Sequence, residues 1–271
     1  MKRILFVCSA LFFMSACSTT STGKGLSAFN DNRSFDAIPH LKEGVEEGDK
    51  MASMLLALIY LSDAQVPTDI DKASFYYEKL KALDGNIYDQ HIDYYLDYIQ
   101  ASIFLMDDNV INDSEGVKLL RQSKYLNYSS ALVLLAKSYS TGKGVNTNYR
   151  LAHKLFLRSI EYGDRAQASL GYAWVLAVHE DDGFRQGANP IDFIPDINDI
   201  NEDYLFIYYD TLAAIKGRMG QFEEAVRLQN LAVELVKKEA MNNSSYQTWV
   251  DDYSVQLNAF YNKEPATVPL F

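Results

Sequence analysis

Residues 131–163 read ALVLLAKSYSTGKGVNTNYRLAHKLFLRSIEYG, and this stretch decides how the rest of the chain is interpreted. Its first part places apolar side chains at helical spacing on one face. Gly142 and Gly144 then interrupt the pattern, because glycine alone enters positive φ without steric cost. A second apolar stripe follows, and Gly163 stands where that helix would end. The stretch therefore predicts a hairpin of two amphipathic helices.

The same pattern occurs a second time in the chain. Moving back by 79 positions brings residues of the hairpin onto identical or chemically similar ones without a gap. The matched pairs are Ala131 with Ala52, Leu135 with Leu56, Ala136 with Ala57, Tyr139 with Tyr60, Val145 with Val66, Asn148 with Asp69, Ala152 with Ala73, and Phe156 with Tyr77. An offset of 79 leaves room for one intervening unit, so the repeat is roughly 40 residues long, as in helical solenoids.

The hairpin resembles the Sel1-like repeat, a variant of the tetratricopeptide repeat. The positions that carry the resemblance are Ala131, Leu135-Ala136, Tyr139, Gly142-Lys143-Gly144-Val145, Asn148, Ala152, Phe156 and Gly163. Residues 204–240 resemble an ordinary tetratricopeptide repeat, with Asp210-Thr211-Leu212-Ala213, a turn glycine at Gly220, and Ala225 where the two helices would touch. The resemblance implies an all-α fold, a right-handed α-solenoid of helical hairpins.

This organisation divides the chain into segments. We expect a Sel1-like repeat array over 31–179 and a long loop insertion over 180–203, in which Ile191, Phe193, Ile194 and Ile197 would pack against the repeats. Residues 204–271 would form a tetratricopeptide-like hairpin and a C-terminal capping helix, Trp249 to Tyr261, which covers the apolar end of the array.

The N-terminus has the features of an export signal. Lys2 and Arg3 precede an apolar run that is too short for a permanent membrane span, which predicts a signal peptide over 1–16. Met14-Ser15-Ala16-Cys17 resembles a bacterial lipobox, which implies lipidation of Cys17 and, with Ser18 after it, an outer-membrane location. The alternative is an ordinary cleaved signal with an incidental cysteine. Residues 17–30 are rich in Ser, Thr and Gly and predict a flexible tether.

The charge of the chain limits its partners. Its formal net charge is −11, and without Lys2 and Arg3 the remaining 23 basic residues face 36 acidic ones. Nucleic acid is therefore not expected as a ligand, because neutralising phosphates requires a basic face.

Residues suited to catalysis or metal binding are not arranged in a known motif. The four histidines, His40, His91, His153 and His179, have no paired spacing. His179-Glu180-Asp181-Asp182 is the densest titratable cluster, and we interpret it as structural or solvated. The acidic residues of 192–203 do not follow the EF-hand spacing, so calcium is a minor alternative. We predict no catalytic site, no metal site and no cofactor.

Tyrosine is the most suggestive residue type, with 19 in the chain. Tyr94, Tyr95 and Tyr98 would cover more than one face of a helix, so not all of them can be buried. Since Tyr is common at interfaces, these three and Phe193 form the candidate interaction surface, for protein or glycan.

Together these patterns favour a non-enzymatic lipoprotein on the periplasmic face of the outer membrane, which acts as a docking or assembly scaffold for another envelope protein. The alternatives are a polysaccharide- or peptidoglycan-binding module and, less favoured, a cell-wall hydrolase.

Overall fold

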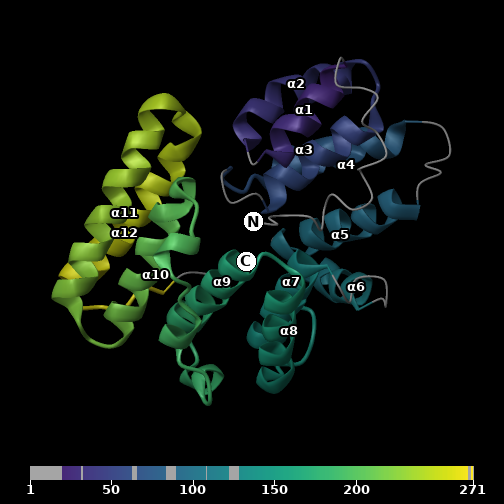
Figure 1. The fold of residues 1–271 in the computed structure, drawn as a ribbon. Coiled ribbons are helices and arrows are strands. Elements are labelled where there is room, and N and C mark those ends of the chain that lie inside the picture. Colours follow the sequence, from purple (N-terminus) through teal and green to yellow (C-terminus); the bar gives the residue numbers. More distant parts are fainter. Residues whose placement is uncertain are drawn as a thin grey trace. The chain divides into compact units, whose positions relative to one another are not determined.

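The computed structural model describes residues 20–31, 33–62, 66–83, 90–107, 109–121, 128–267 and 270. These residues are helical, without strands, and twelve α-helices pack mostly against their neighbours in the chain (Figure 1). The chain divides into two compact units, 1–147 and 148–271. The predicted all-α class is confirmed. The predicted signal peptide and Cys17 lie outside the described residues.

Unit 1 contains seven helices: α1 (Ser21–Asn30), α2 (Ser34–Glu46), α3 (Lys50–Ser62), α4 (Ile70–Ala82), α5 (Gln90–Met106), α6 (Val110–Leu120) and α7 (Ser129–Thr141). The main contacts join α1 with α2, α3 with α4, and α5 with α6, so the helices pair in chain order.

The expected flexible tether over 17–30 is wrong for its second part, because residues 21–30 form α1. Thr20 caps this helix by accepting a hydrogen bond from the Gly23 amide, at 3.0 Å. Small residues allow α1 to approach its neighbours closely: a Cβ on Gly25 would lie 2.6 Å from Cγ of Leu41, and one on Gly44 would lie 2.3 Å from Oγ1 of Thr22. The composition alone suggested a linker, and tertiary packing overrides it.

The two copies of the repeat use matching positions in the same way. Eight matched residues on α3 and α7 are all at most 7% exposed: Ala52, Leu56, Ala57, Tyr60, Ala131, Leu135, Ala136 and Tyr139. The seventh and eighth pairs, on α4 and α8 (Tyr149–Tyr162), are also buried: Ala73 with Ala152, and Tyr77 with Phe156.

The residues that cap α4 and α8 at their N-termini also match. Asp69 accepts from the Lys72 amide at 2.9 Å and caps α4, while Asn148 accepts from the Leu151 amide at 3.0 Å and caps α8. Each satisfies a donor that the first helical turn leaves free. This shared role gives a physical reason for the Asp/Asn position of the pattern.

The glycines between α7 and α8 have the predicted backbone. Gly142, the C-cap of α7, has φ +84°, and Gly144 has φ +68°. A Cβ on Gly144 would lie 2.3 Å from the Asp113 carbonyl oxygen, so this turn also needs glycine for space. The boundary between the units follows at 147/148, inside the segment predicted as one hairpin.

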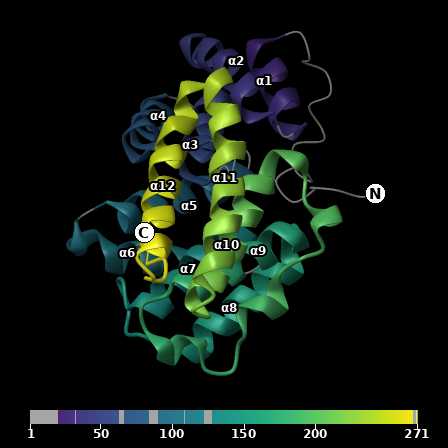
Figure 2. The same ribbon diagram turned by 90° about the vertical axis from the view of Figure 1, so that its left-hand side faces the viewer.

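Unit 2 contains α8, α9 (Arg165–Val178), α10 (Leu205–Arg218), α11 (Phe222–Asn242) and α12 (Gln247–Tyr261). The helices α10, α11 and α12 lie side by side (Figure 2). Gly220, with φ +74°, makes the predicted turn between α10 and α11, and Ala225 is fully buried there. The predicted last helix is confirmed: α12 packs along α11, and its Phe260 fills the space over Gly217 of α10.

Residues 180–203, which we call the strap, are not an unstructured loop. Four short 3-10 helices form it: η2 (Asp182–Arg185), η3 (Pro190–Phe193), η4 (Ile197–Asp199) and η5 (Glu202–Tyr204, which extends one residue beyond it). As expected, Phe193 and Ile194 pack against the core of unit 2. Contrary to expectation, Ile191 and Ile197 remain 38% and 39% exposed.

Candidate functional site

The strap is attached to α8 and α9 by a cluster of aromatic and titratable side chains. Phe184 of η2 is fully buried, and two imidazoles stack on its ring. His153 of α8 stacks on it with centroids 4.6 Å apart and an angle of 11°, and His179, just after α9, stacks at 4.4 Å and 26°. The Phe184 ring thus joins the strap to both helices.

Hydrogen bonds extend this cluster. The Tyr149 hydroxyl donates to Oδ2 of Asp181, and the Tyr172 hydroxyl is paired with Nδ1 of His153. Nδ1 of His179 accepts from the Asp181 amide at 3.1 Å, which places any proton of the neutral ring on Nε2. Asp181 also caps η2 through the Gly183 amide, at 2.7 Å.

Two arginines bind the C-terminal end of α9. Arg218 of α10 donates from Nε to the Ala177 carbonyl at 2.9 Å and from Nη2 to the His179 carbonyl at 3.3 Å. Arg185 of the strap donates from Nη1 to the His179 and Leu176 carbonyls and forms an ion pair with Asp182. These carbonyls have no partner within the helix, and their partial negative charge favours cations.

The electrostatics of the cluster follow from burial and pairing. Burial lowers the pKa of His153, which favours the neutral ring. The hydrogen bond from Tyr149 lowers the pKa of Asp181, and the same bond raises the pKa of Tyr149. Burial, and then the charge of Arg218, lower the pKa of Arg185. The arrangement holds a neutral imidazole, a carboxylate and two cations in fixed positions.

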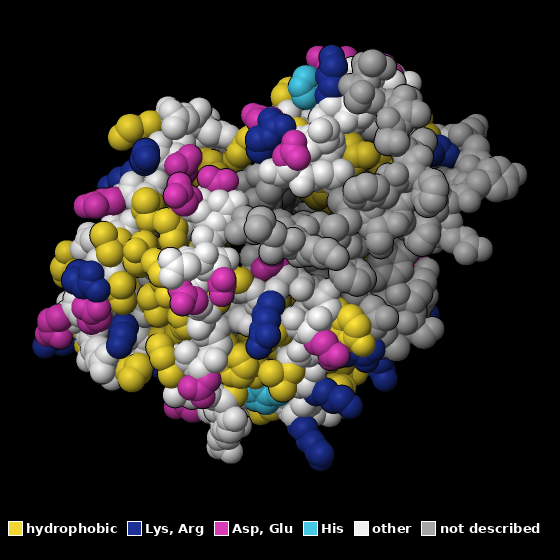
Figure 3. Space-filling view, viewed as in Figure 1, with side chains coloured by type: hydrophobic (Ala, Val, Ile, Leu, Met, Phe, Trp, Pro, Cys, Tyr) yellow, Lys and Arg dark blue, Asp and Glu magenta, His cyan; other side chains and the backbone are white. Residues whose placement is uncertain are grey.

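These contacts hold the strap against α8 and α9. His179 is 6% exposed and Tyr172 is 1% exposed, so neither offers a polar atom to a substrate in this structure. A histidine is visible among hydrophobic side chains over α8 and α9 (Figure 3).

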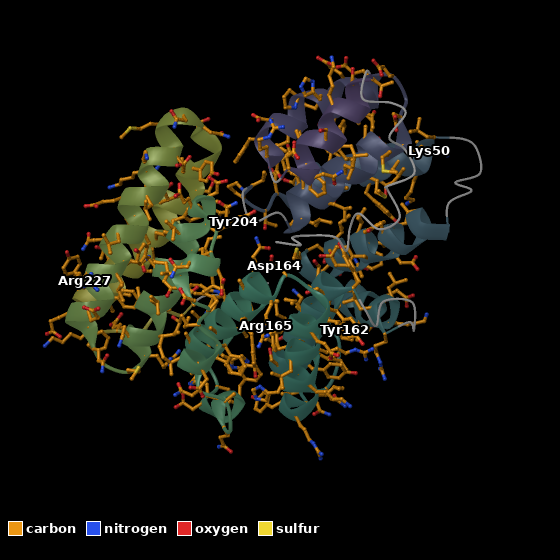
Figure 4. All side chains as sticks on the ribbon, viewed as in Figure 1. Lys50, Tyr162, Asp164, Arg165, Tyr204 and Arg227 are labelled. Carbon is orange, nitrogen blue, oxygen red and sulfur yellow. The ribbon has the colours of Figure 1, made fainter. Side chains whose placement is uncertain are left out.

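The connection between these helices is tight: Tyr162 ends α8, and Asp164 caps α9 through the Gln167 amide, with Arg165 its first residue (Figure 4).

The candidate interaction surface from the sequence does not form as expected. Tyr95 and Tyr98 are 6% and 3% exposed, and both rings pack edge-on against Tyr128. The side chain of Tyr94 lies outside the described residues. Phe193 is half-buried, with its ring 4.5 Å from that of Tyr172. The two buried tyrosines belong to the core of unit 1, because α5 packs on α3 and α4 as well as on α6.

Sequence reasoning found one part of the strap cluster and missed another. It identified His179 to Asp182 as the densest titratable group and interpreted it as structural or solvated, and His179, Asp181 and Asp182 take part in the cluster. It missed Phe184, Arg185 and Arg218. The signal for Phe184 was an aromatic residue within an otherwise polar segment, EDDGFRQGAN.

A hollow of about 520 Å³ lies on unit 1, between α1 and the start of α2. Lys24, Arg33 and His40 contribute to its lining. Of these, Arg33 is paired with Asp31 at 3.1 Å and with Asp36 at 2.8 Å.

Two further features concern metal binding and membrane spans. Among the described residues, no three His, Cys, Asp or Glu side chains are grouped as a metal site. Over the same ranges, no helix combines the length and the apolar character needed to cross a membrane.

Comparison of the chain with models of protein families, with curated proteins and with solved structures found no match.

Proposed function

We propose that this chain is a non-enzymatic docking scaffold of the bacterial cell envelope, built as a right-handed α-solenoid of helical hairpins. The observation that supports the proposal is the similarity of the two repeats: six of the eight matched pairs are buried at both positions, and Asp69 and Asn148 cap the helices that follow the turns. Stacked hairpins of this kind create extended surfaces that suit binding of another protein.

The location is part of the same proposal. A signal peptide over 1–16 and a lipid on Cys17 would hold the protein on the periplasmic face of the outer membrane. The support is the sequence alone, Lys2-Arg3, the apolar run and Met14-Ser15-Ala16-Cys17. The partner is another envelope protein.

The burial of two tyrosines weakens the glycan-binding alternative. That alternative required exposed tyrosines as stacking platforms, and two of the three candidates, Tyr95 and Tyr98, are buried. We therefore keep the protein scaffold as the proposed function.

In-cell photocrosslinking tests the scaffold proposal. A crosslinking amino acid is placed at exposed positions of different helices, for example Phe75 of α4, which is 54% exposed, and Met241 of α11, which is 84% exposed. We expect one position to capture a defined envelope protein and the other to remain uncrosslinked. Equal labelling at both positions, or capture of glycan alone, contradicts the proposal.

The anchor is tested separately. We expect the wild-type chain to incorporate labelled palmitate and to fractionate with the membrane. We expect Cys17→Ala to lose both properties. Unchanged fractionation of Cys17→Ala contradicts the anchor and leaves the scaffold proposal intact.

A further inference from the structure

The outer face of α8 is basic, whereas the rest of unit 2 is acidic. Arg150, Lys154 and Arg158 recur every fourth residue, and Leu157 beside them is 51% exposed. Residues 163–271 contain eight Lys and Arg but 17 Asp and Glu. Lys and Arg side chains are seen at the lower right of Figure 3, over α8. We call Arg150, Lys154 and Leu157 the α8 face.

This arrangement is locally unfavourable for the helix. Side chains four residues apart are neighbours on a helix, and like charges at that spacing destabilise it by a few tenths of a kcal/mol, about 0.2–0.5 per pair. Arg150 also lies in the first turn of α8, which contains no acidic residue, where the helix dipole disfavours a cation. Neither Arg150 nor Lys154 forms an ion pair with any described residue. The charges of Arg150 and Lys154 therefore do not stabilise α8 through ion pairs, whereas Arg158 lies over the ring of Tyr162 at 5.3 Å.

The strap has the opposite properties in the same unit. It exposes five carboxylates that take part in no ion pair within the described ranges: Asp192, Asp196, Asp199, Glu202 and Asp203. Ile191 and Ile197 lie among them and are 38% and 39% exposed. The strap thus offers negative charge with apolar side chains, and the α8 face offers positive charge with an apolar side chain.

We propose that the α8 face is a docking surface for the strap of a second copy of this chain. Among the described residues of one copy, Arg150 and Lys154 form no ion pair with the carboxylates of the strap, although both sets of side chains are exposed. A contact between copies would pair them and cover Leu157 and the two isoleucines. The contact is head-to-tail, because each copy contributes two different surfaces, so it closes into a ring or continues as a chain.

The net charge sets the conditions under which this contact is seen. Two copies with a net charge of −11 each repel one another at long range, so the attraction comes from the local pairing. Exposed ion pairs are screened by salt, since the Debye length falls from about 10 Å at 0.1 M to about 3 Å at 1 M. The association is therefore weakened at 1 M salt.

Sedimentation equilibrium of the purified full chain, at about 10–200 μM and 0.1 M salt, tests the proposal. The wild-type chain is expected to self-associate. Arg150→Glu with Lys154→Glu is expected to weaken association at least tenfold, and so is Asp196→Lys with Asp199→Lys. A one-to-one mixture of the two variants is expected to restore association, because each supplies the surface that the other has lost.

A matched control separates the local contact from net charge. Lys237→Glu with Lys238→Glu changes the net charge by the same amount on exposed positions of α11, and association is expected to persist. The proposal is overturned if the wild-type chain stays monomeric throughout, if the α11 control weakens association equally, or if the mixture fails to associate. Circular dichroism of each variant confirms that its helices remain folded.

Discussion

A single carboxyl group in the core of unit 2 makes stability depend on pH. Asp210 of α10 is 3% exposed, and its Oδ1 accepts a hydrogen bond from Nε2 of Gln229 at 2.8 Å. Gln229 shares the same amide with the Tyr253 carbonyl, at 3.3 Å. Burial raises the pKa of Asp210 to about 7, because a charge is costly in an apolar environment, and the charge of Asp252 adds to the effect.

We therefore expect the wild-type chain to lose stability as pH rises from about 4 to about 7. The folded state binds the Asp210 proton more tightly than the unfolded state, so its contribution is complete below the unfolded pKa of 3.8 and is lost as pH passes through about 7. The loss is at most about 4 kcal/mol, at 1.36 kcal/mol per pKa unit.

Thermal unfolding at pH 5, 6.5 and 8 measures this dependence. Asp210→Asn keeps the acceptor for Gln229 and cannot ionise, so its melting temperature is expected to vary less with pH. The control is Asp251→Asn on the exposed side of α12. Parallel pH profiles for wild type and Asp210→Asn contradict the assignment.

Phe184 is the second residue whose substitution is expected to change the stability strongly. It is fully buried between His153 and His179, and truncation leaves a cavity that the two imidazoles border. Phe184→Ala is expected to cost about 3–5 kcal/mol, as large-to-small core changes do. Phe184→Leu, which keeps most of the volume, is expected to cost less.

Two measurements check this. Urea unfolding gives the loss of stability, and limited proteolysis shows whether cleavage begins within the strap. Ile197→Ala, at a 39% exposed position of the same strap, is the control and is expected to change stability by less than about 1 kcal/mol. Resistance of Phe184→Ala to proteolysis contradicts a role in holding the strap.

At the scale of the helices, the sequence predicted best where periodicity and turn chemistry agree. The apolar stripes and Gly142, Gly144 and Gly220 define helices and turns by local rules, and all three glycines have positive φ. Predictions failed where packing decides. Residues 21–30 have the composition of a linker but form α1, since Gly25 lets it lie against Leu41.

The candidate site shows the same limit. Tyr95 and Tyr98 form the core of unit 1 because of contacts with Tyr128, 30 or more positions away in the chain, and no local pattern contains that information. The strap cluster likewise joins residues from 149 to 218. Its titratable part was recognised because His179 to Asp182 are adjacent in the sequence, and Arg218 was missed because it lies on another helix, far along the chain.

The two capping residues allow a prediction at this scale. Asp69 and Asn148 hold equivalent places in the repeats, so Asp69→Ala and Asn148→Ala are each expected to destabilise the chain by about 1 kcal/mol. Asp69→Asn and Asn148→Asp keep an acceptor and are expected to change stability little. Chemical denaturation measures all four variants. If alanine at one position is harmless and at the other costly, the repeats are not equivalent.

At the scale of the whole molecule, the chain consists of two compact units with separate sets of packed helices. In unit 2 the core is formed by α9 to α12, with Ala266 of the C-terminal segment among its buried residues. In unit 1 the pairs α1–α2 and α3–α4 bury Leu41 and the apolar face of α3. We therefore expect calorimetry to resolve two unfolding transitions.

Variants assign the transitions to the units. Gly25→Val forces a side chain against Leu41, and such overpacking destabilises a core by about 1–3 kcal/mol. This variant is expected to lower the melting temperature of the unit 1 transition only. Asp210→Asn at pH 8 is expected to raise only the transition of unit 2. Ser27→Ala, on the exposed side of α1, is the control for the first change. One transition that responds to both variants would show that the units unfold together, because changes in separate cores then share a single cooperative equilibrium.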